Sequence, residues 1–243
     1  TSVIACGCEA GIEMTIPANL TPDRRPGISV LLFSMSKSEL SKQVENRVGQ
    51  CVLTCPTTSV FNGFESGEPI NLVKNIRFFG DGWQISKKIN GKRFWRIPTM
   101  DGEFLGEEKV NFLKGVGGGN LLILARDTKS ALIIAETGVE AIKNMKNVIT
   151  PFPGGVVRSG SKVGSKYKNL IASTNERFCP SLRNLINNSQ LSENVGCVLE
   201  IVIDGVSEKD VSNAMKASMR AILSKGNDSG LLKLSAGNYG GKL

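Results

Sequence analysis

A weak internal repeat constrains the fold of this 243-residue chain more than any other feature of its sequence. Residues 3–13, VIACGCEAGIE, parallel residues 156–166, VVRSGSKVGSK, with glycines at matching offsets. Residues 27–57 parallel residues 196–237, because each segment runs from an apolar, strand-like stretch through a serine into an amphipathic pattern. A short strand-like stretch follows in both segments. Such self-similarity predicts two halves that share one supersecondary unit.

Each amphipathic pattern begins with a helix-capping motif. Ser36 precedes Glu39 by three positions, and Ser207 precedes Asp210 by the same spacing. In this arrangement the serine oxygen accepts a hydrogen bond from a backbone amide of the first helical turn. The sequence therefore predicts that a helix begins at each serine.

The second half contains six predicted elements. In order, they are a strand at 119–126, a helix from Thr128 to about Met145, a strand at 148–157, a strand at 196–205, a helix from about Ser207 and a strand at 231–236. Strand, helix, strand, strand, helix, strand is the order of the split-βαβ, or ferredoxin-like, fold. The first half shows only the last four of these elements. We therefore expect a strand and a helix, roughly 40 residues, to be missing before residue 1.

The predicted fold class is α+β, with two ferredoxin-like lobes produced by internal duplication and the first lobe incomplete at its N-terminus. The first lobe is predicted to span residues 1–100, and the second lobe residues 101–243. Residues 75–106 are rich in aromatic residues and contain the turn dipeptides Asp-Gly and Asn-Gly. These features predict one or two β-hairpins inserted in the first lobe.

The composition indicates a cytoplasmic protein. Hydrophobic residues make up 40% of the chain and charged residues 21%, as in an ordinary globular domain. No apolar run is long enough to span a membrane, and no leader segment precedes a cleavage site, so a membrane partner is not expected. The 6 cysteines show no C-x-x-C spacing, so buried free thiols are favoured over a disulfide framework or a zinc site.

The net charge of +8 favours an acidic partner. The basic residues are spread along the chain without a dense block, and the strands at 119–126 and 196–205 lack the aromatic residues that stack nucleic-acid bases. Small anionic ligands are therefore preferred, and no nucleic-acid partner is expected. A basic ferredoxin-like nucleic-acid binder remains the weaker alternative.

The chain has 0 histidines, which removes whole classes of catalytic chemistry. Ser-His-Asp and Cys-His nucleophiles and histidine metal motifs are excluded. Any proton transfer must then depend on carboxylates, lysines, tyrosines or water.

One strand contains an unexpected carboxylate. In GCVLEIVIDG, residues 196–205, Ile201 and Ile203 lie on one face at period two, and Glu200 lies on the other face between Val198 and Val202. Either Glu200 is exposed to solvent on an uncovered sheet face, or its side chain is buried because it has a functional role. From the residues alone, the uncovered face is the preferred interpretation, because ferredoxin-like sheets have one open face.

Glycine-rich stretches offer a candidate anion site. Residues 154–166 fail the phosphate-loop pattern, because Ser161 stands where that motif requires lysine. What remains is a turn that exposes backbone amides beside Lys162 and Lys166, which could cradle an anion. Tight turns at strand ends explain this stretch and the glycines of 115–120 and 236–241 equally well.

Long segments of the chain resemble formylmethanofuran–tetrahydromethanopterin formyltransferases. These segments are TSVIACGCEAGIE, TPDRRPGISVLLF, RVGQCVLTCPTTSVF, FFGDGWQ, PFPGGVVRSGSKVGSK, ASTNERFCPSL, CVLEIVIDG and KLSAGNYGGKL. They cover essentially the whole chain in order. An N-terminal segment and a short C-terminal tail of the family are absent, so we expect an internal fragment of such an enzyme.

The resemblance implies a cytoplasmic enzyme of one-carbon metabolism, in methanogenesis or formaldehyde oxidation. It implies reversible formyl transfer between formylmethanofuran and tetrahydromethanopterin, which act as carrier substrates without a metal or prosthetic group. It also implies two ferredoxin-like lobes and a homotetramer, or a subunit of a formyltransferase/hydrolase complex. A formyltransferase-like scaffold subunit of a larger formyl-processing complex is the alternative.

The resemblance places the catalytic carboxylate at Glu200. Formyl transfer between nitrogens passes through a tetrahedral oxyanion, which a neutral carboxyl group can stabilise by donating a hydrogen bond. Val198 and Val202 would keep such a carboxyl group dry and neutral. Seven further residues are expected to bind the anionic substrates, namely Ser161, Lys162, Lys166, Ser173, Thr174, Asn175 and Asn238.

Overall fold

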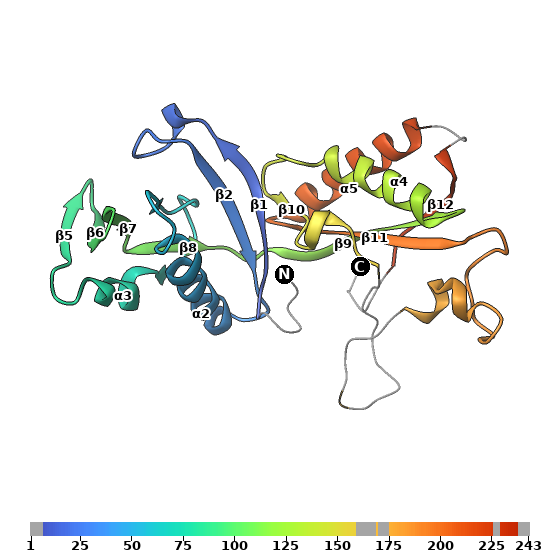
Figure 1. Ribbon diagram of the computed structural model, residues 1–243, viewed down its shortest axis with the longest axis horizontal. Coiled ribbons are helices and arrows are strands. Elements are labelled where there is room, and N and C mark those ends of the chain that lie inside the picture. The colour runs from blue at the N-terminus through green and yellow to red at the C-terminus, as the bar shows by residue number, and fades with distance from the viewer. Residues whose placement is uncertain (1–6, 159–168, 170–174, 226–228, 238–243) are drawn as a thin grey trace.

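The computed structural model describes residues 7–158, 169, 175–225 and 229–237. These residues form a mixed α+β structure with four sheets and few helices. Figure 1 shows the two halves of the chain side by side along the longest axis, with β9 (Val116–Ala125) leading into the second half. No helix in the described ranges is long and apolar enough to cross a membrane.

The second half contains one four-stranded sheet. Its strands are β9, β10 (Val148–Ile149), β11 (Cys197–Gly205) and β12 (Leu231–Ser235), in the spatial order β10-β11-β9-β12 with antiparallel neighbours. Helices α4 (Thr128–Glu140) and α5 (Glu208–Ser224) lie together on one face of this sheet (Figure 1). The strand-helix-strand-strand-helix-strand order predicted for this half is therefore observed.

The main core lies between this sheet and its two helices. Leu121 and Ile123 of β9 and Ile201 and Ile203 of β11 are buried there, as period-two alternation predicts. Each such side chain contributes roughly 1.5–3 kcal/mol by leaving water. Gly138 allows α4 to approach α5 closely, because a Cβ atom at this position would lie 2.6 Å from Ser218 Oγ.

Both predicted serine caps are present. Ser36 Oγ accepts the Glu39 backbone N–H at 3.2 Å and so begins α2 (Lys37–Arg47). Ser207 Oγ accepts the Asp210 N–H at 3.2 Å and so begins α5. These bonds satisfy amides that have no partner inside the helix.

Helix α4 ends at Glu140, earlier than the predicted Met145. Asn144 and Asn147 adopt left-handed backbone conformations, with φ of 62° and 69°. Asparagine tolerates this conformation, which cannot continue a right-handed helix.

The predicted strand at 148–157 pairs with β11 only at its two ends. Val148 and Ile149 pair with Gly205 and Asp204, and Val157 pairs with Glu200. Between them, residues 153–155 form a 3₁₀ turn in which Gly154 and Gly155 have φ of 64° and 75°. The hydrogen-bond ladder between this segment and β11 is interrupted because Pro151 and Pro153 have no N–H group to donate and Gly154 and Gly155 have positive φ.

The first half begins with a separate two-stranded sheet. Strand β1 (Glu9–Ile16) pairs antiparallel with β2 (Gly27–Phe33). The strand predicted after α2 is wrong, because residues 48–52 instead extend the helix as a π-turn. Val48 and Val52, four positions apart, pack with Leu53 on a small core around Leu72. The apolar run therefore serves helical rather than strand packing.

The predicted hairpins are present. Strands β5 (Ile85–Ile89), β6 (Lys92–Thr99) and β7 (Gly102–Glu107) follow one another as antiparallel neighbours. At the β5–β6 turn, Asn90 and Gly91 have φ of 50° and 79°, which is typical of an Asn-Gly hairpin. The remaining described elements are β3 (Ser59–Val60), which pairs parallel with β7, β4 (Glu68–Asn71), which pairs with β8 (Lys109–Phe112), α3 (Val73–Ile76), and the short turns η1 (Ala18–Leu20), η2 (Val48–Val52), η3 (Arg77–Gly80), η4 (Pro153–Gly155), η5 (Glu176–Phe178) and η6 (Pro180–Leu182).

Strand β1 joins the first half to the second. A Cβ atom at Gly11 would lie 3.0 Å from Ile149 Cβ, so the two backbones approach closely. The buried carboxylate of Glu13 accepts the backbone N–H of Asn147. These contacts place β10 of the second half against β1 of the first half.

Candidate functional site

The backbone of Glu200 is held on both edges of β11. On one edge, Glu200 lies opposite Leu122 of β9. On the other edge, the Glu200 and Val157 backbones exchange two N–H···O=C bonds of 2.8 Å each. Strand β11 is therefore an interior strand at this position, and the direction of the Glu200 side chain is fixed by the pleat.

The Glu200 side chain is buried. Ile201 and Ile203 point into the core beneath α4 and α5, so Glu200 projects from the opposite face, as the alternation predicts. Only 4% of Glu200 is exposed to solvent. The uncovered-face interpretation, which the residues alone favoured, is therefore wrong.

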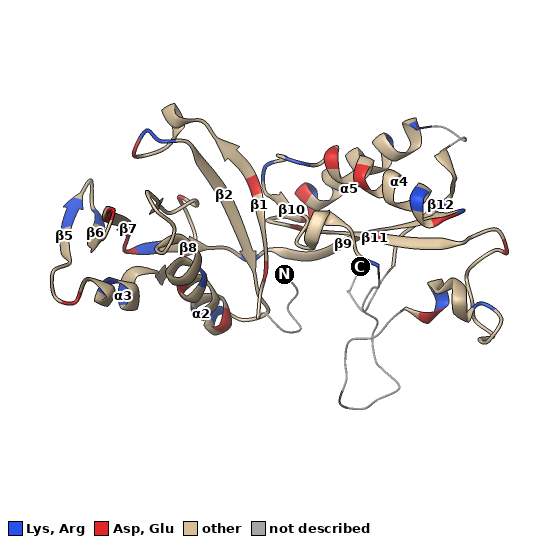
Figure 2. Ribbon diagram, viewed as in Figure 1, with Lys and Arg blue, Asp and Glu red and all other residues tan. Residues whose placement is uncertain are grey.

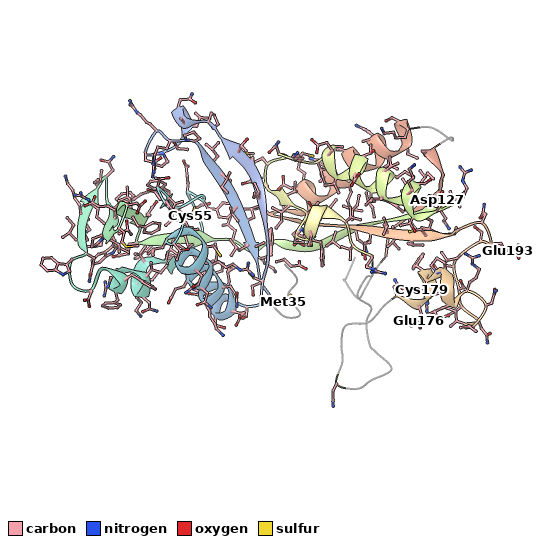
Figure 3. All side chains as sticks on the ribbon, viewed as in Figure 1. Met35, Cys55, Asp127, Glu176, Cys179 and Glu193 are labelled. Carbon is pink, nitrogen blue, oxygen red and sulfur yellow. The ribbon has the colours of Figure 1, made fainter. Side chains whose placement is uncertain are left out.

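Residues 175–195 cover part of this second face. Val195 is buried with Leu122 and Leu124 of β9, and Phe178 and Leu191 pack on the same cluster. Figure 3 shows Glu176, Cys179 and Glu193 on this segment, across the sheet from the two helices. The Arg183 guanidinium donates to the carbonyl oxygens of Glu193 and Val195, which fixes the end of the segment.

Asn120 makes a direct contact with the carboxyl group of Glu200. Its Nδ2 donates to Glu200 Oε1 at 2.7 Å, and its Oδ1 accepts the backbone N–H of Gly237 at 2.9 Å. Asn120 is only 5% exposed. The sequence analysis did not identify this residue. The available signal was that Asn120 is the only polar residue in the segment NLLILA, which is otherwise apolar.

Six of the predicted binding residues lie outside the described residues, namely Ser161, Lys162, Lys166, Ser173, Thr174 and Asn238. Asn175 is described and begins the η5 turn. Its carbonyl oxygen accepts the Phe178 N–H at 3.0 Å and the Cys179 thiol at 3.2 Å. Asn175 therefore belongs to the segment that covers the Glu200 face. Burial, aided by the charge of Glu176, raises the pKa of the Cys179 thiol.

A second carboxyl group on the Glu200 face was also missed. Asp204 is fully buried near the end of β11, and its Oδ1 accepts the Gly118 N–H at 3.1 Å. Burial first, and the neighbouring Glu9 carboxyl second, raise the pKa of Asp204 to about 8. Asp204 thus lies where β1 of the first half meets the second half.

The remaining charges are dispersed. Figure 2 shows lysine and arginine on elements of both halves, including β5, β8 and the loops. Among the described residues, no group of three or more His, Cys, Asp or Glu side chains is arranged to hold a metal ion.

Comparison with protein families identifies the class of enzyme. Residues 1–99 match the family described as formylmethanofuran-tetrahydromethanopterin formyltransferase (FTR). Residues 102–243 match the family described as "FTR, proximal lobe". The chain is therefore a transferase that acts on a formyl group. It belongs to the formylmethanofuran–tetrahydromethanopterin formyltransferase family, so the resemblance seen in the sequence is confirmed.

Relatives of known name and structure agree with this assignment. A formylmethanofuran–tetrahydromethanopterin formyltransferase of Methylobacillus flagellatus is 57% identical over 247 residues, covering 100% of this chain and 82% of that protein. The formyltransferase/hydrolase complex from Methylorubrum extorquens with methylofuran contains a chain of TM-score 0.94 and 48% identity, with coverage of 100% and 80%. The formyltransferase from Methanosarcina barkeri gives a TM-score of 0.91 and 45% identity, with coverage of 100% and 82%.

Proposed function

We propose that this chain transfers a formyl group reversibly between formylmethanofuran and tetrahydromethanopterin, with Glu200 as the catalytic acid–base group. The observation that carries the catalytic assignment is the burial of Glu200, 4% exposed, on the sheet face away from the helices. Burying a carboxyl group costs free energy. Buried carboxyl groups are therefore typically paired with another polar group or located at a functional site. Membership of the family supplies the reaction.

The chemistry requires one group that can donate a hydrogen bond and then a proton. The nitrogen of tetrahydromethanopterin attacks the formyl carbon of formylmethanofuran, and the carbonyl oxygen becomes an oxyanion. A protonated Glu200 donates a hydrogen bond to this oxygen, and its proton then passes to the methanofuran nitrogen as the C–N bond breaks. The proton lost by the attacking nitrogen returns the carboxyl group to its starting state. With 0 histidines in the sequence, a carboxyl group is a suitable residue for both steps.

Both substrates must be held together, because the reaction joins two bound molecules. Ser161, Lys162, Lys166, Ser173, Thr174, Asn175 and Asn238 are proposed to bind their anionic groups. Chain connectivity supports this proposal. Val157, which bonds to Glu200, comes shortly before Ser161, and Gly237, which bonds to Asn120, immediately precedes Asn238.

The finer architecture is proposed with the function. Two ferredoxin-like lobes related by duplication, spanning residues 1–100 and 101–243, are supported by the repeat and by the element order of the second half. A cytoplasmic homotetramer that uses methanofuran and tetrahydromethanopterin without a prosthetic group is proposed from family membership.

A role within a larger complex is the second candidate. One component of the formyltransferase/hydrolase complex of Methylorubrum extorquens is 49% identical to this chain over 249 residues. This similarity supports assembly with partner subunits, either as an active transferase or as a scaffold. The buried, hydrogen-bonded Glu200 favours the active form.

Single-turnover formyl transfer tests the proposal. Wild-type protein is mixed with formylmethanofuran and tetrahydromethanopterin, and Glu200→Gln is measured beside it. Glutamine retains a donor of similar shape but has no transferable proton, so we expect the chemical step to slow about 10²–10⁴-fold while both substrates still bind. Glu107→Gln is the matched control, because Glu107 is also buried and accepts a backbone N–H, that of Asn62, at 2.9 Å.

The outcomes separate the candidates. Near-wild-type turnover in Glu200→Gln would end the acid–base assignment. A wild-type protein that binds both carriers but transfers no formyl group would instead support the scaffold role.

A further inference from the structure

We propose that Asn120 is the positioning residue of the catalytic carboxyl group, selecting which oxygen of Glu200 carries the transferable proton. This inference rests on the proposed function of Glu200. It starts from one contact, the 2.7 Å bond from Asn120 Nδ2 to Glu200 Oε1, which joins β9 to β11 across 80 residues of sequence.

The orientation of the Asn120 amide is fixed by its second partner. The backbone N–H of Gly237 can only donate a hydrogen bond, and it lies 2.9 Å from Oδ1. The group at this end of the amide must therefore be the oxygen, which leaves the NH₂ group facing Glu200. A flipped amide would set two donors against each other at Gly237.

This orientation makes the two oxygens of Glu200 unequal. Oε1 accepts the amide hydrogen, and the carbonyl oxygen of a neutral carboxyl group is a better acceptor than its hydroxyl oxygen. When Glu200 is neutral, this bond therefore favours the form whose hydroxyl is at Oε2. The proton that Glu200 donates to the oxyanion, and later to the leaving nitrogen, is held at Oε2.

Burial makes the selection effective. Asn120 is 5% exposed and Glu200 is 4% exposed, so water does not compete for the bond between them. Asn120 lies opposite Val202 in the β9–β11 ladder, one diagonal step from Glu200 on the same face. Neighbouring strands therefore hold both side chains, and the hydrogen bond between them restrains rotation of the carboxyl group.

Two other ionisable residues of this sheet have different surroundings. Lys233 of β12 lies opposite Leu124 and is exposed, and Asp204 lies further along β11 and accepts the Gly118 N–H. In the part of the chain that the structure describes, neither residue has a hydrogen bond with Asn120.

Asn120→Asp is the diagnostic variant. One carboxylate oxygen can still accept the Gly237 N–H, but the other then faces Oε1 of Glu200. When both groups are ionised they repel, and when both are protonated the new carboxyl group can donate to Oε1 while Oε2 keeps the transferable proton. We expect kcat to fall about 10- to 100-fold at about pH 8 and to recover partly toward pH 6, with KM changed less than about threefold. Asn120→Ala should lose a similar factor in kcat without the recovery at low pH.

Two further variants separate positioning from folding. Asn120→Asp combined with Glu200→Gln reverses the donor and the acceptor, so the thermal stability lost in Asn120→Asp should return while formyl transfer remains slow. Asn111→Asp is the matched control, because the part-buried Asn111 Nδ2 donates to the Phe64 carbonyl at 2.8 Å. It should lower thermal stability without changing kcat or its pH profile.

Each result decides between positioning and its alternatives. If Glu200→Gln is slow but Asn120→Asp and Asn120→Ala turn over within twofold of wild type at every pH, the positioning role is wrong and the proposed function stands. An increase in KM with unchanged kcat would also overturn the inference. So would a fall in the kcat of Asn120→Asp that is the same at every pH. A fast Glu200→Gln variant would instead overturn the proposed catalytic role of Glu200.

Discussion

Replacing Asp204 with asparagine tests how the two halves of the molecule are held together. Asp204 is 0% exposed, and its Oδ1 accepts the Gly118 N–H at 3.1 Å. The carboxyl group of Glu9, on β1 of the first half, is its neighbour. Burial of Asp204, followed by its interaction with Glu9, raises the pKa of Asp204 from 3.8 to about 8. The folded protein therefore binds a proton here that the unfolded chain releases.

The sign and the size of the effect follow from this pKa. A carboxyl group whose pKa is raised on folding contributes stability that is fully present below about pH 4 and is lost as the pH rises through about 8. Each tenfold change in proton affinity corresponds to about 1.4 kcal/mol, so the pH-dependent part of the free energy of unfolding is on the order of 5 kcal/mol. This is a large fraction of the roughly 5–15 kcal/mol typical of a folded domain.

Asp204→Asn removes the titration while keeping the shape. The asparagine oxygen can accept the Gly118 N–H, and its NH₂ group can donate to Glu9. We expect the free energy of unfolding, measured by urea titration, to fall from pH 5 to pH 9 in the wild type and to change much less in the variant. At pH 9 the variant should be the more stable protein by about 1–3 kcal/mol.

Asp101→Asn is the control for loss of one carboxylate. Asp101 is exposed, and hydrogen bonds from Thr99 and the Thr57 backbone lower its pKa, so its titration lies below this pH range. A wild-type stability that is flat from pH 5 to pH 9, or an Asp204→Asn slope equal to that of the wild type, would refute the assignment of a buried proton to Asp204.

Two further changes test local packing and capping. Gly138→Ala improves helix propensity but places a Cβ atom 2.6 Å from Ser218 Oγ and 2.8 Å from Ile222 Cδ1, so we expect a net loss of about 1–3 kcal/mol in urea unfolding. A gain in stability would show that α4 and α5 can move apart freely; Gly63→Ala, with no atom within 4 Å of its Cβ, is the control and should change little. Ser207→Ala removes the hydroxyl that accepts the Asp210 N–H at 3.2 Å and should lower stability by about 1 kcal/mol, whereas an unchanged transition midpoint would exclude a capping contribution.

Local pattern was sufficient for several elements in both halves. The alternation around Glu200, the two serine caps and the Asn-Gly hairpin turn depend on residues a few positions apart, so they can be read from adjacent letters. The same patterns gave the order of the six elements. They were weaker near residues 48–52, where an apolar run that reads as a strand packs instead at helical spacing.

The sequence by itself determined that Glu200 lies on the face opposite the helix core, and only the tertiary structure decided that its carboxyl group is buried. Residues 175–195 cover part of this face by packing against Leu122 and Leu124 of β9, which are far away in the chain. The amide that orients Glu200 comes from Asn120, 80 residues earlier, and the group that neighbours Asp204 comes from β1 of the other half. Periodicity reports the direction of a side chain relative to its own strand, whereas burial and charge pairing depend on which distant segments fold over it.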